Sequence, residues 1–465
     1  MDLFHRLHSG KILFKILGGL IYIMKRFSQK QWVWFFIICL LVFFGIQFIR
    51  KPVENPPVTA NLQAPDSIQV IMIKSCYDCH SNTTRLSWFD KIAPASWIVG
   101  DHIREGRKLL NFSEWDSLTD LQKKSLLFES LNQIEFGEMP LQQYTFLHPL
   151  AKVTTKEINT LKSYLNTLFY SPVSDTSKAR ISQEQYEQWM QRKKDKQDVK
   201  PTLNGILYMP GYKDWVAISS TERLDNGTMR VIVGNDITVN AIRANLTNPW
   251  PDGSVIVKIL WSMVADSSGN IQAGELKQLD FMIKGKEKYA STMGWGFARW
   301  VRGLELAPYG KNALFASECM NCHQTMKSHD FIFTMPIHPE SASGLKDKVI
   351  SSSIQPQEGT MSTLYGNNIA AHFARSQRGN EYPSGSVLTL VTWKQKEDDH
   401  WFGARIPSAT QFVETVSITD SVIGTPTSVY EKYRGTSHEK MNDQKMADSK
   451  ERMKNILSRR ASVMP

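Results

Sequence analysis

The chain has 465 residues, a hydrophobic fraction of 42% and a formal net charge of +10. This length predicts about two to four domains, and the apolar content is sufficient for each of them to have a core. The Lys and Arg residues are dispersed and do not interleave with stacking aromatics. This pattern argues against nucleic acid as a partner and favours a membrane surface or an anionic protein.

Residues 31–49 carry no charged side chain and form the first predicted element. A helix rises about 1.5 Å per residue, so this segment spans about 28 Å, close to the hydrocarbon core of a bilayer. Lys and Arg precede it, so the positive-inside rule places the N-terminus in the cytoplasm. We therefore expect residues 1–50 to hold a single-pass anchor in the cytoplasmic membrane, with the later domains in the periplasm. Cys39 lies inside the apolar run and is interpreted as inert packing.

Two further segments flank the predicted anchor. Residues 12–24 form a shorter apolar stretch that is interrupted by Lys15. This stretch either lies along the membrane interface or precedes a natural start at Met24. Residues 51–66 are rich in proline, which predicts an extended linker that lifts the first domain off the membrane.

The most specific signal in the chain is a pentapeptide, Cys-x-x-Cys-His, that occurs twice. The two copies are Cys76-Tyr-Asp-Cys79-His80 and Cys319-Met-Asn-Cys322-His323. This motif is typical of c-type haem attachment, because two thiols on one helical turn can each bond a vinyl group of the porphyrin. The adjacent histidine then binds the iron. We expect two covalently bound haem c groups. The alternative interpretation is a thioredoxin-like redox pair.

Residues 67–170 predict an all-α domain around the first motif, because apolar residues recur at spacings of three and four. His80 is the expected proximal ligand of the iron. Met139 lies between a Gly-Glu turn and a proline, which is typical of a loop, and it is the expected sixth ligand. A thioether at this position closes the iron and favours electron transfer. His102 and His148 are rival ligands, and each is more simply explained as a surface or hydrogen-bonded histidine.

Two stretches of this domain carry a family resemblance. They are CYDCHSNTTRLSWFDKIAPASWIVGDHIREGRKLLNFSEW and GEMPLQQYTFLHPLAK. Residues 65–170 resemble the haem-binding domain family of membrane-tethered cytochromes. The resemblance implies one haem and electron transfer, and it does not identify a substrate.

The rest of the chain divides into four segments by composition. They are a polar connector over 171–202, a β-rich domain over 203–340, a second β-rich domain over 341–435 and a charged tail over 436–465. Strand-like runs separated by Gly, Asn, Asp and Pro predict mainly antiparallel sheets with a few helices. The tail is compatible with either a helix or disorder, and no chemistry is assigned to it.

An internal repeat relates the two β-rich domains. Residues 227–261 align without a gap on residues 359–393, and the alignment keeps Gly, Pro and Trp positions such as Trp261 on Trp393. Repeated glycine and proline positions over such a length indicate two copies of one domain. The second copy has no cysteine and is expected to bind no haem. It could replace the second subunit of a dimer and form a pseudo-dimer within one chain.

The second haem is the candidate reactive centre. His323 is its expected proximal ligand, while Met326 and His329 are too close in sequence to reach the far face of the porphyrin. An open sixth position permits ligand binding or catalysis. Lys258 shares a strand face with aliphatic residues, and the repeat has Leu390 at the same position. An inward lysine is costly unless it is neutral, paired or covalently used; the alternative is a lysine that extends to solvent at a sheet edge.

Residues 205–335 resemble the cytochromes P460. The matching features are Tyr212-Lys-Asp-Trp215, Pro251-Asp-Gly-Ser-Val-Ile-Val-Lys258, Gly294-Trp-Gly-Phe297, the second haem motif and Asp330-Phe-Ile-Phe333. The resemblance implies an antiparallel fold that pairs as homodimers, and a lysine cross-linked to the porphyrin at the position of Lys258. It also implies a distal carboxylate at Asp280; the alternative is a surface acid at a strand–helix junction. Arg230 is a further candidate for the distal pocket.

Three functions follow as alternatives. The first is oxidation of hydroxylamine or a similar nitrogen compound by the second haem, with the first haem passing the electrons to a redox partner. The second is binding or sensing of nitric oxide with Lys258 free, as in the related cytochromes c prime beta. The third is an electron conduit with both irons six-coordinate. A peroxidase is less favoured, because no distal histidine is accompanied by a matching arginine.

Overall fold

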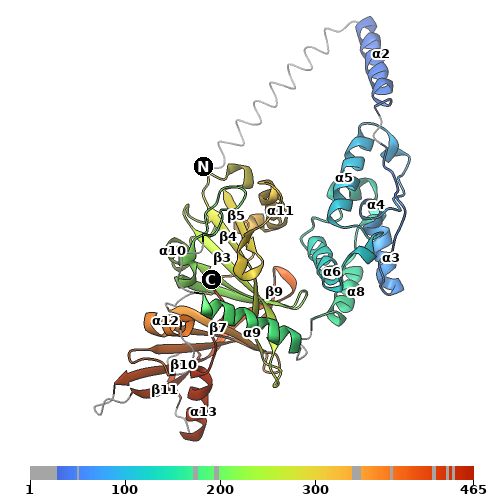
Figure 1. Cartoon of the computed structure of the whole chain (residues 1–465). Helices are drawn as coiled ribbons and strands as arrows, with labels where there is room; N and C mark the ends of the chain where they lie inside the picture. The colour runs from blue at the N-terminus through green and yellow to red at the C-terminus, as the bar shows by residue number, and fades with distance from the viewer. Residues whose placement is uncertain are drawn as a thin grey trace. The chain divides into compact units, whose positions relative to one another are not determined.

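The computed structural model in Figure 1 describes residues 29–49, 52–170, 176–192, 198–337, 347–376, 381–420, 426–435, 439–441 and 446–465. The apolar stretch at 12–24 and the alternative start at Met24 lie outside the described residues. The chain divides into two compact units. Each unit is made of two segments of the chain. The first unit contains the residues up to Thr119 together with Gln143–Val153, and the second contains Asp120–Gln142 and Thr154–Pro465.

The first unit is helical. Its elements are α2 (Gln29–Ile46), α3 (Asp66–Ser75), α4 (Tyr77–His80), η1 (Phe89–Lys91), α5 (Ala95–Leu109), η2 (Trp115–Ser117), α7 (Gln142–Leu147) and η3 (Pro149–Ala151). Helix α2 is long and apolar enough to cross a membrane, and none of its residues is buried. Its end is held by the unit itself. The Gln47 side chain exchanges two hydrogen bonds with the backbone of Ala93 (3.1 and 2.9 Å), and Trp97 donates to the Ile49 carbonyl (2.7 Å).

The proline-rich segment after α2 differs from the predicted linker. It runs along the first unit, where Thr59 N–H donates to the Ser113 carbonyl (3.0 Å) and Arg107 donates to the Glu54 carbonyl (2.6 Å). Proline keeps this backbone extended, which leaves its polar groups without partners inside the segment. The neighbouring residues of the unit supply those partners, so the segment is part of the unit's surface.

Helices α6 (Asp120–Glu135) and α8 (Thr155–Thr167), which lie in the segment predicted as the first haem domain, group by their contacts with the second unit. The ring of Phe128 stacks on Phe402 with a centroid distance of 5.8 Å. The Asn132 amide accepts from the Phe402 N–H (2.7 Å) and donates to its carbonyl (3.3 Å). These contacts join α6 to a strand far along the chain, which sequence periodicity cannot reveal.

Twelve strands in the described part of the second unit form one antiparallel sheet. They are β1 (Val216–Arg223), β2 (Thr228–Gly234), β3 (Val255–Ala265), β4 (Ile271–Lys284), β5 (Trp295–Val301), β6 (Ala307–Pro308), β7 (Lys348–Gln355), β8 (Thr360–Gly366), β9 (Val387–Asp398), β10 (Trp401–Asp420), β11 (Pro426–Arg434) and β12 (Glu439–Lys440). The remaining helical elements are α9 (Thr176–Gln191), η4 (Pro210–Asp214), α10 (Asp236–Arg243), η5 (Ala290–Thr292), η6 (Gly303–Glu305), α11 (Phe315–His323), η7 (Gln324–His329), α12 (Asn368–Ser376) and α13 (Met446–Leu457).

The two repeats have the same order of elements. One runs β1, β2, α10, β3, β4 and the other runs β7, β8, α12, β9, β10. Their sheets meet at two equivalent places, because β1 pairs with β10 (Glu222 opposite Arg405) and β4 pairs with β7 (Ile271 opposite Ile354). Trp261 and Trp393, which correspond in the repeat, lie in one shared core. The two copies therefore face each other through the same surface.

Strand β3 shows how residue alternation separates the shared core from a second face. Val257, Ile259 and Trp261 are fully buried in the core between the repeats. Ile256 belongs instead to a separate apolar cluster that includes residues of α10 and α11. Since side chains two residues apart lie on the same face of a strand, Lys258 shares the second face with Ile256.

The described end of the C-terminal tail, residues 446–465, is helical at Met446–Leu457 and contributes buried residues to the core. Helix α13 buries Ile456 completely against the second repeat. Beyond it, the Val463 carbonyl accepts a hydrogen bond from Trp261 (2.9 Å), and Met464 is buried in the shared core. The tail is mostly polar in sequence, so the few apolar residues that anchor it give a weak periodic signal.

Candidate functional site

The first Cys-x-x-Cys-His motif lies at the junction of α3 and α4 in the first unit. The His80 ring nitrogen Nδ1 is 3.1 Å from the carbonyls of both Gly106 and Leu110. Nδ1 therefore carries the proton and donates, which leaves Nε2 for a metal. Gly106 permits this approach, because a Cβ atom there would lie 2.8 Å from the Cys79 carbonyl oxygen.

The other residues predicted for this site are placed as follows. Burial raises the pKa of Cys76 to about 12 and that of Cys79 to about 11, so both are neutral thiols at pH 7. His148 is hydrogen-bonded to Asp90 (3.2 Å), while His102 is half-buried on α5. Met139 is half-buried in the turn after α6 and belongs to the second unit. Its ligation of the iron bound by His80 stays a prediction.

The second motif lies at the C-terminal end of α11, which packs against β5. His323 donates from Nδ1 to the Phe331 carbonyl (2.7 Å), so Nε2 is again left for a metal. The rings of Phe297 and Phe333 lie 5.3 and 5.1 Å from the imidazole. Burial lowers the pKa of His323 to about 4, which keeps the ring neutral at pH 7, as a metal ligand must be.

Four strands bring the predicted residues Lys258 and Asp280 together beside this motif. Ile232, Lys258, Asp280 and Arg299 stand opposite one another in a row across β2, β3, β4 and β5. Lys258 Nζ lies 2.8 Å from Asp280 Oδ2. Arg299 Nε donates to Asp280 Oδ1. The row places one carboxylate between two cations on the face that α11 covers.

The charges of this row are strongly coupled. Burial lowers the pKa of Lys258 to about 8, and the nearby Asp280 carboxylate only partly opposes that shift. Burial would raise the pKa of Asp280, but the cations Arg299 and Lys258 outweigh it and hold that pKa well below its usual range. Both charges of the Lys258–Asp280 pair also act on the pKa values of Cys319 and His323, so the row and the motif share one site.

Arg230 reaches the same face from β2. Burial lowers its pKa to about 9, and its Nε atom is buried without a hydrogen-bond partner among the described residues. An orphaned buried donor is uncommon and usually points to a missing partner. Two thiols on one helical turn, a neutral histidine and a donor without a partner fit a covalently attached haem with a ligand or propionate nearby.

Two families match these segments. The haem-binding domain family matches residues 39–167, and the cytochrome P460 family matches residues 209–334. The chain is a fusion of a haem-binding domain and a cytochrome P460 domain. Each matched segment contains one Cys-x-x-Cys-His motif, so the chain is a haem cytochrome whose cofactor is haem iron. No curated protein matches the chain.

Two residues of the P460 site were missed by the sequence analysis. Arg299 contacts Asp280, and alternation along β5 could have indicated it, because it shares a face with Phe297. Glu129 lies on α6 of the haem-binding segment, and burial raises its pKa. Its charge acts on Cys322. No local pattern could have indicated Glu129, because only the packing of α6 against β10 brings it to the P460 domain.

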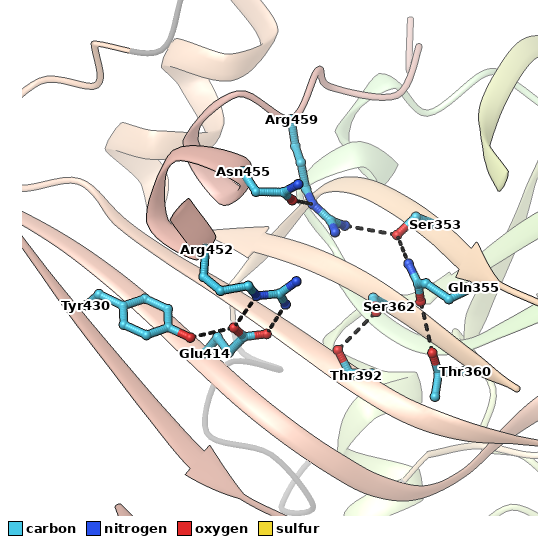
Figure 2. A network of polar contacts seen from close by, with 10 residues as sticks. All are labelled: Ser353, Gln355, Thr360, Ser362, Thr392, Glu414, Tyr430, Arg452, Asn455 and Arg459. Atoms are coloured by element: carbon cyan, nitrogen blue, oxygen red, sulfur yellow. Dashed lines mark hydrogen bonds and ion pairs between the residues drawn. The ribbon is translucent and has the colours of Figure 1, made fainter. Parts of the chain in front are cut away.

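The second repeat has a counterpart of the Lys258–Asp280 row. Leu390 stands opposite Glu414 on β9 and β10, as Lys258 stands opposite Asp280. Glu414 is 1% exposed. Its carboxylate accepts two hydrogen bonds from the Arg452 guanidinium (2.9 and 2.5 Å) and one from the Tyr430 hydroxyl (2.6 Å), as Figure 2 shows. Helix α13, which supplies Arg452, packs against β11 as α11 packs against β5. A helix without cysteine thus stands where the P460 domain has α11 with its Cys-x-x-Cys-His motif.

Changing Asp280 to Asn is expected to destabilise the protein by about 2 kcal/mol at pH 7, because two cations lose their common anion. The native pKa of Asp280 lies below its unfolded value of about 3.9, so its stabilisation is present above that pH and is lost as the pH falls. Urea unfolding at pH 7 and at pH 3 measures both effects. A D280N protein that loses as much stability on acidification as the wild type would contradict this assignment.

Proposed function

We propose that this chain is a membrane-anchored dihaem c-type cytochrome. In this proposal the P460 domain oxidises a small nitrogen compound such as hydroxylamine, and the haem-binding domain carries the electrons to a redox partner. The observation that carries the proposal is the Lys258–Asp280 pair, which lies on the strand face beside the second haem motif. A lysine at this position is what the P460 resemblance requires for a cross-link.

Attachment of the two haems would use the residues already described. Cys76, Cys79, His80 and Met139 would hold the first haem. Cys319, Cys322 and His323 would hold the second haem. A haem in the P460 domain would supply one-electron redox chemistry and a position for the nitrogen compound.

Lys258 is suited to covalent chemistry. Its pKa of about 8 leaves about one molecule in ten with a neutral amine at pH 7, whereas an ordinary lysine at about 10.4 has fewer than one in a thousand. A neutral amine is the nucleophilic form. Joining Nζ to a porphyrin carbon would replace one N–H and one C–H bond and would release two protons and two electrons to an external oxidant. Asp280 would then lose one of its two cations, and its pKa would rise.

Asp280 would then accept protons from the bound compound. Oxidation of hydroxylamine to nitrous oxide or nitric oxide releases protons and electrons in equal number, so a proton acceptor and an electron acceptor are both needed. Arg299 holds the carboxylate in place through its hydrogen bond to Oδ1. Arg230 Nε is an unused donor on the same face.

The remaining parts of the proposal concern assembly. Helix α2 would anchor the chain in the cytoplasmic membrane, with the N-terminus inside and the haem domains in the periplasm. Tethering raises the effective concentration of donor and acceptor. The second repeat would take the place of a second subunit, because both copies share one core and pair at two equivalent edges. A homodimer of the whole chain is the alternative.

A second candidate function is the binding of nitric oxide without turnover. The observation in its favour is that the Asp280 carboxylate already pairs with the Lys258 ammonium, at 2.8 Å. A third candidate, electron conduction through two six-coordinate irons, predicts that the reduced protein does not bind carbon monoxide.

The visible spectrum of the reduced protein tests the proposal. A cross-linked haem is expected to absorb far to the red of an ordinary c-type haem, and hydroxylamine should reduce the oxidised protein. Changing Lys258 to Arg keeps a cation beside Asp280 but cannot form the same bond, so this variant should lose the red-shifted band and the turnover while keeping both haems. Mass spectrometry should find Lys258 joined to the haem peptide. A free Lys258 peptide in the wild type would favour nitric oxide binding instead.

A further inference from the structure

A buried ion pair connects the loop that follows the second haem motif to strand β4. Lys284 Nζ on β4 contacts both carboxylate oxygens of Asp330, at 2.8 and 2.7 Å. Each residue is 7% exposed. The ring of Trp295 lies 4.8 Å from the same ammonium. None of these residues belongs to the motif or to the Lys258 row.

Asp330 is fixed by backbone contacts as well. Its Oδ2 atom accepts the Trp250 N–H (2.8 Å), and its carbonyl accepts the Trp295 indole N–H (2.9 Å). The residue thus connects the loop to β4, to β5 and to the segment before β3. A carboxylate with this many partners has one available position, because each partner lies on a different rigid element.

The backbone at this point has an uncommon conformation. Asp330 has φ 47° and Phe331 has φ 68°, so two consecutive residues other than glycine are left-handed. Such residues persist only where surrounding contacts determine them, and they cluster at functional sites. The consequence of this turn is that the Phe331 carbonyl points at His323 Nδ1, 2.7 Å away.

We propose that Asp330, held by Lys284, is a positioning residue that sets the orientation and the donor strength of His323 as a ligand of the haem iron. This inference rests on the proposed function, in which His323 binds that iron. A ring N–H that is held by a fixed carbonyl makes the opposite nitrogen a stronger donor to the metal. Loss of such an outer contact typically lowers the metal affinity or the activity of a site by about ten- to a hundredfold.

The experiment compares Asp330→Asn with Glu414→Gln in the full-length haem protein. Glu414 is a matched control, because it is also a buried carboxylate paired with a cation, but in the repeat without a haem motif. The measurements are the iron–histidine stretching frequency of the reduced protein by resonance Raman spectroscopy and the midpoint potential of the P460-domain haem. D330N is expected to lower the frequency and raise the potential, whereas E414Q should leave both at wild-type values.

A second variant keeps the test valid if D330N does not fold. Lys284→Met removes the cation but leaves the Trp250 N–H on Asp330, and it should shift both measurements in the same direction by a smaller amount. Unchanged frequency and potential in a folded D330N or K284M protein would overturn the inference. Haem content distinguishes this result from failure of the proposed function: wild-type protein without haem at Cys319 and Cys322 would overturn both, while two haems with unshifted spectra in the variants would overturn only the positioning role.

Discussion

A protein with Cys319 and Cys322 both changed to Ser is expected to lose about half of its covalently bound haem, because this motif is one of two in the chain. It should also lose the visible haem absorption of the P460 domain and the proposed oxidation of hydroxylamine. Serine matches cysteine in size but forms no thioether bond. The haem content is measured as pyridine haemochrome per polypeptide, and covalent attachment is measured by haem staining after denaturing electrophoresis.

The reciprocal variant and a third cysteine provide the controls. Changing Cys76 and Cys79 to Ser should remove the other half of the haem and leave the P460-domain spectrum in place. Cys39 lies exposed on the apolar helix α2, and its change to Ser should leave the haem content unchanged. Full haem content after loss of either pair would show that the corresponding motif does not attach a haem.

Changing Arg452 to Met is expected to lower the free energy of unfolding by about 3 kcal/mol, because it leaves a buried carboxylate without its cation. Glu414 is buried, while the Arg452 side chain is 43% exposed, which places the effect at the lower end of the range for a broken buried pair. Burial would raise the pKa of Glu414, but Arg452 outweighs it and lowers that pKa. Urea unfolding followed by tryptophan fluorescence measures the change.

An exposed ion pair serves as the comparison for Arg452. Arg180 and Glu184 are four residues apart on α9 and both are exposed, so Arg180→Met should cost less than about 0.5 kcal/mol. Equal stability of the R452M and R180M proteins would mean that the Arg452–Glu414 pair does not hold α13 on the second repeat. The haem content of R452M should stay at the wild-type level, because α13 lies outside both haem motifs.

The haem cofactor was predictable from local sequence, and both family matches support it. The prediction needs only two thiols and a histidine at a fixed short spacing, which Cys76–His80 and Cys319–His323 have. Covalent attachment at these motifs stays a prediction. The apolar helix α2 was predictable for the same reason, since crossing a membrane depends on length and composition. Lys258 was indicated by alternation along one strand and by its contrast with Leu390 in the repeat.

The tertiary structure alone decided which distant residues act on these motifs. Arg299 contacts Asp280 because their strands pair. Glu129 lies near the P460 domain because of the packing of α6. Asp330 contacts Lys284, which is 46 residues away in the sequence. The role of the tail, whose α13 covers the second repeat, was equally hidden. The sequence by itself determined the features that short spacing governs, namely the two Cys-x-x-Cys-His motifs and the apolar helix, whereas contacts between residues far apart depend on register and packing, which no local pattern encodes.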